Sequence, residues 1–278
     1  MTATYTPAAP IWCSGCGHYG VLGALRGAIA DLGIPAHELV TLAGIGCSGT
    51  IQNYLGTYGY HALHGRVLPT ATGVALANPD LTVIAAGGDG DGYAIGAGHL
   101  VHAFRRNASV AYVVMSNETY GLTKGQLSPT RPTEHGRLDA VAMGLAIAST
   151  TFVARGYGGW SEQLRRLVRQ ALEHVRARQG FAFVEVISPC VTYWDTYSHW
   201  DQALYDLDAD DAYDPSDRAA AFALTQELAA AGRLPAGLVY RAPALVPAEL
   251  PCPARAAIEP GPLLPAYEAI LDEYAAAG

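Results

Sequence analysis

Gly88-Asp89-Gly90-Asp91-Gly92 directly follows the apolar run Leu81-Thr82-Val83-Ile84-Ala85-Ala86, which has the length and composition of a buried strand. A helix predicted over 93–106 leads from this stretch to a second apolar run, which ends at Ser116-Asn117-Glu118-Thr119. Because strands that alternate with helices pair in parallel, the stretch predicts an α/β fold with a doubly wound, mainly parallel sheet. In the intervening helix, the apolar spacing predicts that Ile95, Leu100, Val101 and Phe104 are buried.

The ends of these two strands carry oxygen ligands. Asp89 follows the first strand and Asn117 follows the second, and the carboxyl ends of parallel strands meet at one edge of a sheet. A carboxylate and an amide oxygen suit Mg²⁺ shared with phosphate oxygens, and the flanking glycines let backbone N–H groups approach closely. We therefore expect a diphosphate-binding site at this edge. In the simpler alternative, the stretch is a tight turn in which Asp89 or Asp91 caps the helix at residue 93.

Composition narrows the class of protein. The chain has 278 residues, of which 50% are hydrophobic and 15% are charged, which is enough apolar surface for one large α/β domain with or without an appendage. The net charge of -8 and the single lysine, Lys124, argue against a nucleic-acid partner. There is no apolar run of about 18 residues and no basic region followed by an apolar one at the start, which predicts no membrane span and no secretion signal.

Cysteine usage indicates metal or redox chemistry. The five cysteines, an odd number, include Cys13 and Cys16 in a Cys-Ser-Gly-Cys segment, which fits a reducing compartment such as the cytoplasm better than a disulfide framework. Cys47 and Cys190 each follow a predicted strand, so both belong at the same sheet edge. Four thiolates at one place bind an iron–sulfur cluster or zinc, and the alternative is a set of buried, inert cysteines.

The composition changes after Trp200. Seven aspartates fall between Asp201 and Asp217, and an alanine-rich helix and a proline-dotted segment follow. We therefore expect an α/β domain over residues 1–200 and an extension or arm over 201–278 that packs on the core or on a partner subunit. Cys252, in this extension, is interpreted as incidental.

Two further segments lie near the predicted site. His64-Gly65-Arg66 offers donors to an anionic or polar ligand, although an ordinary surface position is the alternative. The segment 120–126, which holds Lys124, directly follows the oxygen ligands of the second strand.

Taken together, these motifs resemble those of the β subunits of 2-oxoacid:ferredoxin oxidoreductases, which are thiamine diphosphate and iron–sulfur enzymes that oxidatively decarboxylate 2-oxo acids. The resemblance runs from about residue 12 to residue 194. It rests on six motifs in order: Trp-Cys-x-Gly-Cys-Gly at 12–17, Gly-Ile-Gly-Cys-Ser at 44–48, His-Gly-Arg at 64–66, Gly-Asp-Gly-Asp at 88–91, Tyr-Gly-Leu-Thr-x-Gly-Gln at 120–126 and Ser-Pro-Cys at 188–190.

The resemblance implies a thiamine diphosphate-binding fold and a set of site residues. A [4Fe-4S] cluster would be ligated by Cys13, Cys16, Cys47 and Cys190. Mg²⁺ on the diphosphate would be held by Asp89, Asn117 and the backbone carbonyl of Thr119. Thiamine diphosphate would be lined by Ile45, Gly46, Cys47, Ser48, His64, Gly65, Arg66, Val67, Gly88, Asp89, Gly90, Asp91, Asn117, Gly121 and Leu122.

The resemblance also implies the reaction and the partners. A 2-oxo acid of the pyruvate or 2-oxoglutarate type would lose CO₂, electrons would pass through the cluster to ferredoxin, and coenzyme A would accept the acyl group. An α subunit, or α and γ subunits, would complete the active site. Relatives commonly carry a basic residue where Thr50 stands, so we take Thr50, Arg66, Leu122 and Lys124 as candidates near the substrate.

Two other kinds of protein compete with this interpretation. A non-oxidative thiamine diphosphate decarboxylase subunit would need no cluster, so the four cysteines distinguish it. A non-catalytic, zinc-stabilised binding protein would use the cysteines for zinc instead.

Overall fold

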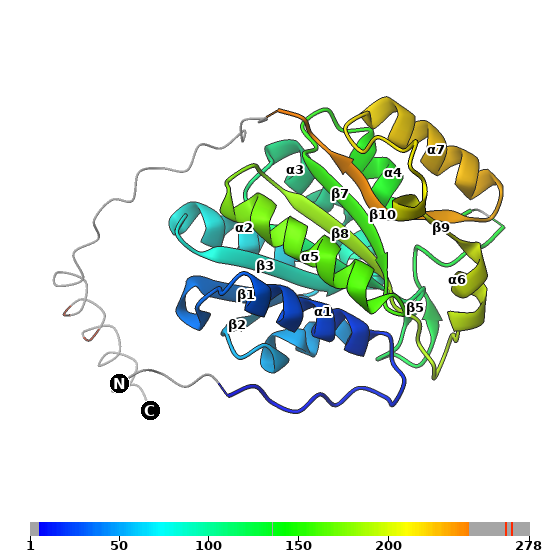
Figure 1. Ribbon diagram of the computed structural model, residues 1–278. Helices are drawn as coiled ribbons and strands as arrows, with labels where there is room; N and C mark the ends of the chain where they lie inside the picture. The colour runs from blue at the N-terminus through cyan, green and yellow to red at the C-terminus, as the bar shows by residue number, and fades with distance from the viewer. Residues whose placement is uncertain (1–5, 135, 245–264, 266–267, 269–278) are drawn as a thin grey trace.

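An eight-stranded sheet forms the centre of the computed structural model, which describes residues 6–134 and 136–244 together with 265 and 268 (Figure 1). The strand order is β2-β1-β3-β4-β8-β7-β10-β9, and only the pair β7–β10 is antiparallel. The prediction of a mainly parallel sheet is therefore confirmed. The strands are β1 Leu39–Ala43, β2 Tyr58–His61, β3 Thr82–Gly88, β4 Ala111–Ser116, β7 Phe152–Tyr157, β8 Ala182–Ile187, β9 Leu204–Asp206 and β10 Leu234–Arg241, with a separate hairpin of β5 Thr119–Tyr120 and β6 Gln126–Leu127.

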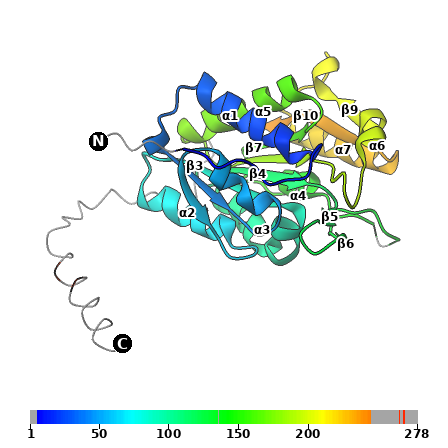
Figure 2. The same ribbon diagram turned by 90° about the horizontal axis from the view of Figure 1, so that it is seen from below.

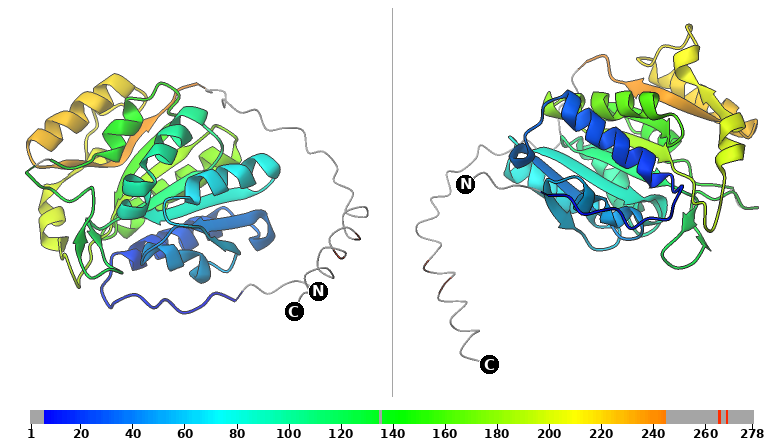
Figure 3. Two further views of the ribbon diagram at one scale, coloured as in Figure 1. Left: turned by 180° about the vertical axis from the view of Figure 1, so that it is seen from behind. Right: turned by 60° about the horizontal axis from the view of Figure 1, so that its bottom comes forward.

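Helices cover both faces of the sheet, as a doubly wound fold requires (Figures 2 and 3). Alternate residues of each central strand point to opposite faces: Ile84 and Ala86 join the core under α1 and α5, whereas Val83 and Ala85 join the core under α2, α3 and α4. The helices are α1 His18–Asp31, α2 Val67–Ala77, α3 Ala97–Arg106, α4 Ala140–Leu145, α5 Ser161–Arg176, α6 Tyr197–Ala203 and α7 Arg218–Ala230. Shorter helical turns occur at Ala36–Glu38, Ser48–Tyr54, Gly90–Ile95 and Leu207–Ala209.

The crossover between β3 and β4 differs from the predicted helix over 93–106. Residues Gly90–Ile95 form a wide, π-type turn, and the regular helix α3 begins only at Ala97. Leu100 and Phe104 are buried as predicted, but Ile95 is 52% exposed and Val101 is 38% exposed. The prediction for these two side chains is wrong, because a π-type turn holds more residues than an α-helical turn and changes the direction in which the following side chains point.

The segment after residue 200 contributes to the sheet. β10 pairs with β7 and carries β9 on its other side, while α7 packs on β10 next to α4 (Figure 1). Of the alternatives offered by the sequence, packing on the core describes residues 204–241, and an arm does not. The first four residues of β10, Leu234 to Gly237, are all buried, and Pro235 and Gly237 among them obscure the strand pattern in the sequence. Cys252 and the proline-dotted segment from residue 245 lie outside the described residues.

A buried ion-pair network ties β7 to β8 on the α2 and α3 side. The guanidinium of Arg155, which is completely buried, donates to Oε2 of Glu185 at 2.6 Å and to Oδ1 of Asp139 at 2.7 Å. The hydroxyl of Tyr93 donates to the other oxygen of Glu185 at 3.0 Å. Buried charges are tolerated only when they are paired in this way.

We expect Arg155→Met to lower the free energy of unfolding by about 3–5 kcal/mol, because it leaves two carboxylates in the interior without their cation. Urea unfolding monitored by circular dichroism measures this change. The control is Arg169→Met on the exposed side of α5, where the pair with Glu173 is solvated and its loss costs about 0.5 kcal/mol or less. Equal losses in the two variants would contradict a specific role for the buried network.

Candidate active site

A cavity of about 300 Å³ lies at the carboxyl ends of β1, β3 and β4. Its volume is at the lower end of the roughly 300–1,000 Å³ that small-molecule sites enclose. The sequence-predicted residues that line it are Ile45, Gly46, Cys47, Ser48, His64, Gly88, Asp89, Gly90, Asp91, Asn117, Thr119, Gly121 and Leu122. Four further lining residues, His18, Met115, Tyr120 and Thr123, are absent from the sequence prediction. The topology thus brings four of the six sequence motifs to one edge.

Asp89 is held by a dense set of donors. Its Oδ2 accepts hydrogen bonds from the backbone N–H of Glu118 at 3.0 Å, from the hydroxyl of Ser128 at 2.5 Å and from the hydroxyl of Thr130. Burial raises the pKa of the Asp89 carboxyl, and the hydroxyl hydrogen bonds oppose this rise. The carboxylate is therefore oriented before any ligand arrives.

Ser128 and Thr130 are functional candidates that sequence reasoning missed. They follow the β5–β6 hairpin, and only the return of that hairpin toward β3 brings them to Asp89. A Ser-Pro-Thr segment carries no metal-site signal by itself.

The turn after β4 presents the other oxygen ligands. Glu118 has a left-handed backbone with φ of 61°, and it lies between Asn117 and Thr119. Oδ1 of Asn117 accepts the backbone N–H of Thr119 at 3.1 Å, which closes the turn. Asp89, Asn117 and Thr119 all line the same cavity, and a carboxylate, an amide oxygen and a backbone carbonyl together suit Mg²⁺ that shares its remaining positions with phosphate oxygens.

Asp91 connects two loops and does not cap a helix. Its Oδ1 accepts from the backbone N–H of Ile45 at 3.0 Å, from that of Gly65 at 2.8 Å and from Nδ1 of His64 at 2.8 Å. A Cβ at Gly44 would come within 1.9 Å of the other carboxylate oxygen, so this position needs glycine. The helix-capping alternative for Asp89 and Asp91 is wrong, since neither side chain caps the turn at Gly90–Ile95.

The four cysteines of the described chain converge beside this cavity. Cys13 is exposed, Cys16 and Cys47 are half-buried, and Cys190 is buried. Burial raises the pKa of the Cys16 thiol to about 11, and the nearby sulfurs of Cys190, Cys47 and Cys13 add to the rise. The other three cysteines are therefore close enough to affect the ionisation of the Cys16 thiol.

Hydrogen bonds hold the cysteine segments together. The indole Nε1 of Trp12 donates to the carbonyl of Cys47 at 2.7 Å, and the N–H of Gly17 donates to the carbonyl of Pro189 at 3.0 Å. A Cβ at Gly17 would lie 2.6 Å from the backbone of Ser188, so glycine is required where these two segments touch. The N-terminal segment is thereby fixed to both strand ends that carry cysteine.

Within residues 6–134 and 136–244, no group of three or more His, Cys, Asp or Glu side chains is placed to hold one metal ion. Four thiolates brought together can hold either zinc or an iron–sulfur cluster.

Several predicted residues lie outside the cavity lining. The Thr50 hydroxyl donates to the carbonyl of Cys47 at 2.9 Å and accepts from Nε1 of Trp12 at 3.1 Å. Arg66 is exposed, and its guanidinium reaches the carbonyls of Gly65 and Ile95. Gly65, Val67 and the exposed Lys124 likewise do not line the cavity, whereas Leu122 does and is 67% exposed.

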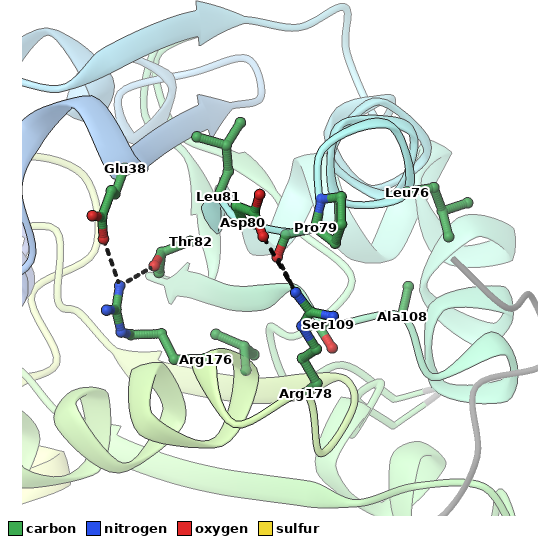
Figure 4. A pocket seen from close by; sticks show the side chains of 12 residues that line it. Glu38, Leu76, Pro79, Asp80, Leu81, Thr82, Ala108, Ser109, Arg176 and Arg178 are labelled. Atoms are coloured by element: carbon green, nitrogen blue, oxygen red, sulfur yellow. Dashed lines mark hydrogen bonds and ion pairs between the residues drawn. The ribbon is translucent and has the colours of Figure 1, made fainter. Parts of the chain in front are cut away.

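A second cavity, of about 430 Å³, lies at the opposite edge of the sheet, where β3 begins at Thr82 (Figure 4). The guanidinium of Arg176 donates a hydrogen bond to the hydroxyl of Thr82 at 2.7 Å and lies 3.7 Å from a carboxylate oxygen of Glu38. The guanidinium of Arg178 lies 3.4 Å from a carboxylate oxygen of Asp80. Both guanidiniums therefore already face carboxylates. The position of this cavity is also remote from every predicted ligand.

The fold and the strand-end cavity define a thiamine diphosphate-binding α/β protein. Residues 44–186 match the family model described as thiamine pyrophosphate enzyme, C-terminal TPP binding domain, and residues 190–249 match the model for the C-terminal part of the pyruvate ferredoxin oxidoreductase beta subunit. The β subunit of 2-oxoacid:ferredoxin oxidoreductase 2 from Aeropyrum pernix is 40% identical over 249 residues, which cover 82% of this chain and 79% of that one. The chain belongs to the β subunits of the 2-oxoacid:ferredoxin oxidoreductases.

Two further relatives agree. The β subunit of a 2-oxoacid:ferredoxin oxidoreductase from Saccharolobus solfataricus is 42% identical over 219 residues, which cover 73% of this chain and 70% of that one. A solved structure of 2-oxoglutarate:ferredoxin oxidoreductase from Magnetococcus marinus, with 2-oxoglutarate, coenzyme A and succinyl-CoA bound, has a TM-score of 0.80 at 35% identity. That match covers 87% of this chain and 84% of the solved one. The helices in the described part of the chain are all too short or too polar to span a membrane.

Proposed function

We propose that this chain binds Mg²⁺–thiamine diphosphate in the strand-end cavity and a [4Fe-4S] cluster on Cys13, Cys16, Cys47 and Cys190. The observation that carries the proposal is the double position of Cys47. This residue lines the cavity, and its carbonyl accepts the indole N–H of Trp12, which directly precedes Cys13, at 2.7 Å. One short loop therefore serves both the cofactor cavity and the cysteine cluster, which suits transfer of electrons over a small distance.

The residues of this chain mainly bind and orient. Asp89, Asn117 and the carbonyl of Thr119 would hold Mg²⁺. Glycine is required at position 90 because the Tyr120 ring packs closely there, and a Cβ would fall 2.2 Å from it. Asp91 holds the loops of Ile45 and His64 against the cavity. When bound, thiamine diphosphate supplies the electron sink that decarboxylation of a 2-oxo acid requires.

The enzyme needs an α subunit as well, since this chain is a β subunit. We propose ferredoxin as the electron acceptor and coenzyme A as the acyl acceptor, supported by the names of the relatives and the ligands of the Magnetococcus enzyme. The proposed substrate is a 2-oxo acid of the pyruvate or 2-oxoglutarate type. Free thiols at the cluster position support a reducing, cytoplasmic location.

Reduction of viologen or ferredoxin by a panel of 2-oxo acids, on the complex of this chain with its α partner, tests the proposal. We expect reduction that depends on coenzyme A, with pyruvate or 2-oxoglutarate as the best substrate. Release of aldehyde without any reduction would instead favour the non-oxidative decarboxylase. The absence of both products with every 2-oxo acid would favour the zinc-stabilised binding protein.

Thr50→Lys tests whether position 50 faces the substrate. If it does, a new cation changes the ratio of kcat/KM between 2-oxoglutarate and pyruvate by about tenfold, the effect of one charged hydrogen bond. Thr50→Val is the matched control, because it removes the bonds to Cys47 and Trp12 without adding charge. Identical substrate ratios in the two variants would show that Thr50 acts only through its contact with Trp12.

A further inference from the structure

Glu118 is a buried carboxylate beside the Mg²⁺ ligands that the proposed function leaves without a role. It is 3% exposed and lies between Asn117 and Thr119. Its backbone φ of 61° is in the left-handed region, which glycine and asparagine adopt readily and glutamate does not. Contacts elsewhere must therefore hold the turn in this conformation.

The side chain of Glu118 is anchored to the segment that follows Cys190. Its Oε2 accepts the indole N–H of Trp194 at 2.9 Å, and its Oε1 lies 3.5 Å from the guanidinium of Arg137. Trp194 is itself fixed, because the guanidinium carbon of Arg131 lies 3.4 Å from the centre of its ring. A charge-assisted bond in a buried position is among the stronger hydrogen bonds in proteins.

The same two residues are bonded to the ligands on either side. The backbone N–H of Trp194 donates to the carbonyl of Cys190 at 2.9 Å. The backbone N–H of Glu118 donates to Oδ2 of Asp89 at 3.0 Å. A continuous path of hydrogen bonds thus runs from a cluster cysteine to a metal-binding carboxylate through Trp194 and Glu118.

We propose that Glu118 is a positioning residue. Through its hydrogen bond to Trp194, it holds the Asn117–Thr119 turn in a fixed position relative to the Cys190 segment, and it thereby fixes the metal ligands relative to the cluster. This inference rests on the proposed function, because it assigns Mg²⁺ to that turn. It concerns the geometry of the ligands and gives Glu118 no part in the chemical step.

Metal binding to the complex of this chain with its α partner, in the presence of thiamine diphosphate, tests the inference. Mn²⁺ replaces Mg²⁺ as the probe, and electron paramagnetic resonance of the free ion gives the half-saturating concentration. Trp194→Phe keeps the ring and removes the N–H. Glu118→Gly removes the side chain without adding backbone strain, and Glu118→Gln keeps an acceptor for the indole. Trp160→Phe is the control, because Trp160 is also half-buried but packs against Tyr157.

We expect Trp194→Phe and Glu118→Gly each to raise the half-saturating Mn²⁺ concentration about tenfold, as the loss of one charged hydrogen bond predicts. The double variant should be no worse than either single one, because both remove the same bond. Glu118→Gln keeps an acceptor but loses the charge, so its effect should lie between those of the unmodified complex and Glu118→Gly. Trp160→Phe should remain within about twofold of the unmodified complex.

Four results would overturn the inference, and only one of them would also refute the proposed function. Unchanged Mn²⁺ binding in both single variants, or effects that simply add in the double variant, would show that Trp194 and Glu118 do not act as one link. An unmodified complex that binds no Mn²⁺ with thiamine diphosphate would refute the proposed function, and the inference with it. A fall in melting temperature with unchanged Mn²⁺ binding would indicate a purely structural role and also contradict the inference.

Discussion

Replacing Asp89 with asparagine is expected to lower kcat about 10²–10³-fold, because Mg²⁺ supplies several kcal/mol of charge stabilisation that the amide cannot retain. The substitution keeps the size of the side chain but removes its charge. It also places an amide donor where Oδ2 now accepts from Glu118, Ser128 and Thr130. Loss of metal affinity and of ligand orientation should therefore occur together.

The dependence of activity on Mg²⁺ concentration measures this effect. We expect the half-saturating Mg²⁺ concentration of Asp89→Asn to rise, with partial recovery of activity at high Mg²⁺. Asp80→Asn, an exposed acid before the other end of the same strand, is the matched control and should behave like the unmodified protein. An Asp89→Asn enzyme with ordinary activity and ordinary Mg²⁺ dependence would remove Asp89 from the metal site.

Replacing Cys13 with alanine is expected to separate the two halves of the reaction. Cys13 is exposed and does not line the cofactor cavity, so thiamine diphosphate and Mg²⁺ should bind as before. Loss of a cluster ligand should lower the rate of viologen or ferredoxin reduction at least about 100-fold. Three measurements on the same preparation separate these effects. Iron content reports the cluster, the reduction rate reports electron transfer, and thiamine diphosphate affinity reports the cofactor site.

Ser14→Ala is the control for this experiment, because the neighbouring exposed residue carries no thiol. It should leave all three quantities unchanged. If Cys13→Ala kept its iron and its reduction rate, Cys13 would not be a cluster ligand, and the proposed set of four cysteines would be wrong.

The sequence predicts well which residues meet at the strand ends, because the signal there is local. Apolar strands of fixed length place Asp89 and Asn117 at their ends, and a parallel sheet then brings these ends together without further information. The same rule places Cys47 and Cys190 at that edge. The only long-range information that this prediction needs is the order of the strands in the sheet. The alternation of strands and helices along the chain already limits that order.

The remaining parts of the site depend on contacts that no local pattern encodes. Ser128 and Thr130 reach Asp89 across 39 and 41 residues because the β5–β6 hairpin folds back over the cavity. The role of Asp91 depends on where the loops of Ile45 and Gly65 come to lie. The sequence alone therefore does not predict which side chains orient other side chains, because that role depends on where the loops lie.

Two features of the fold differ from what local patterns and composition suggest. The π-type turn at Gly90–Ile95 arises next to the cavity, where the tertiary fold outweighs helical spacing, and it exposes Ile95 and Val101. The aspartate-rich segment after Trp200 has the composition of an arm, yet the buried face of β10 adds it to the sheet. Composition describes the surface of that segment and not the few apolar residues that fix it.

The central claim is that thiamine diphosphate in the strand-end cavity passes electrons to a [4Fe-4S] cluster on this chain. Electron paramagnetic resonance of the anaerobically purified complex with its α partner, combined with iron and sulfide analysis, tests it most directly. We expect about four iron and four sulfide ions per chain, and a reduced-cluster signal after addition of the 2-oxo acid and coenzyme A that is absent without thiamine diphosphate. A colourless protein that contains zinc, or a cluster whose signal does not respond to any 2-oxo acid, would contradict this claim.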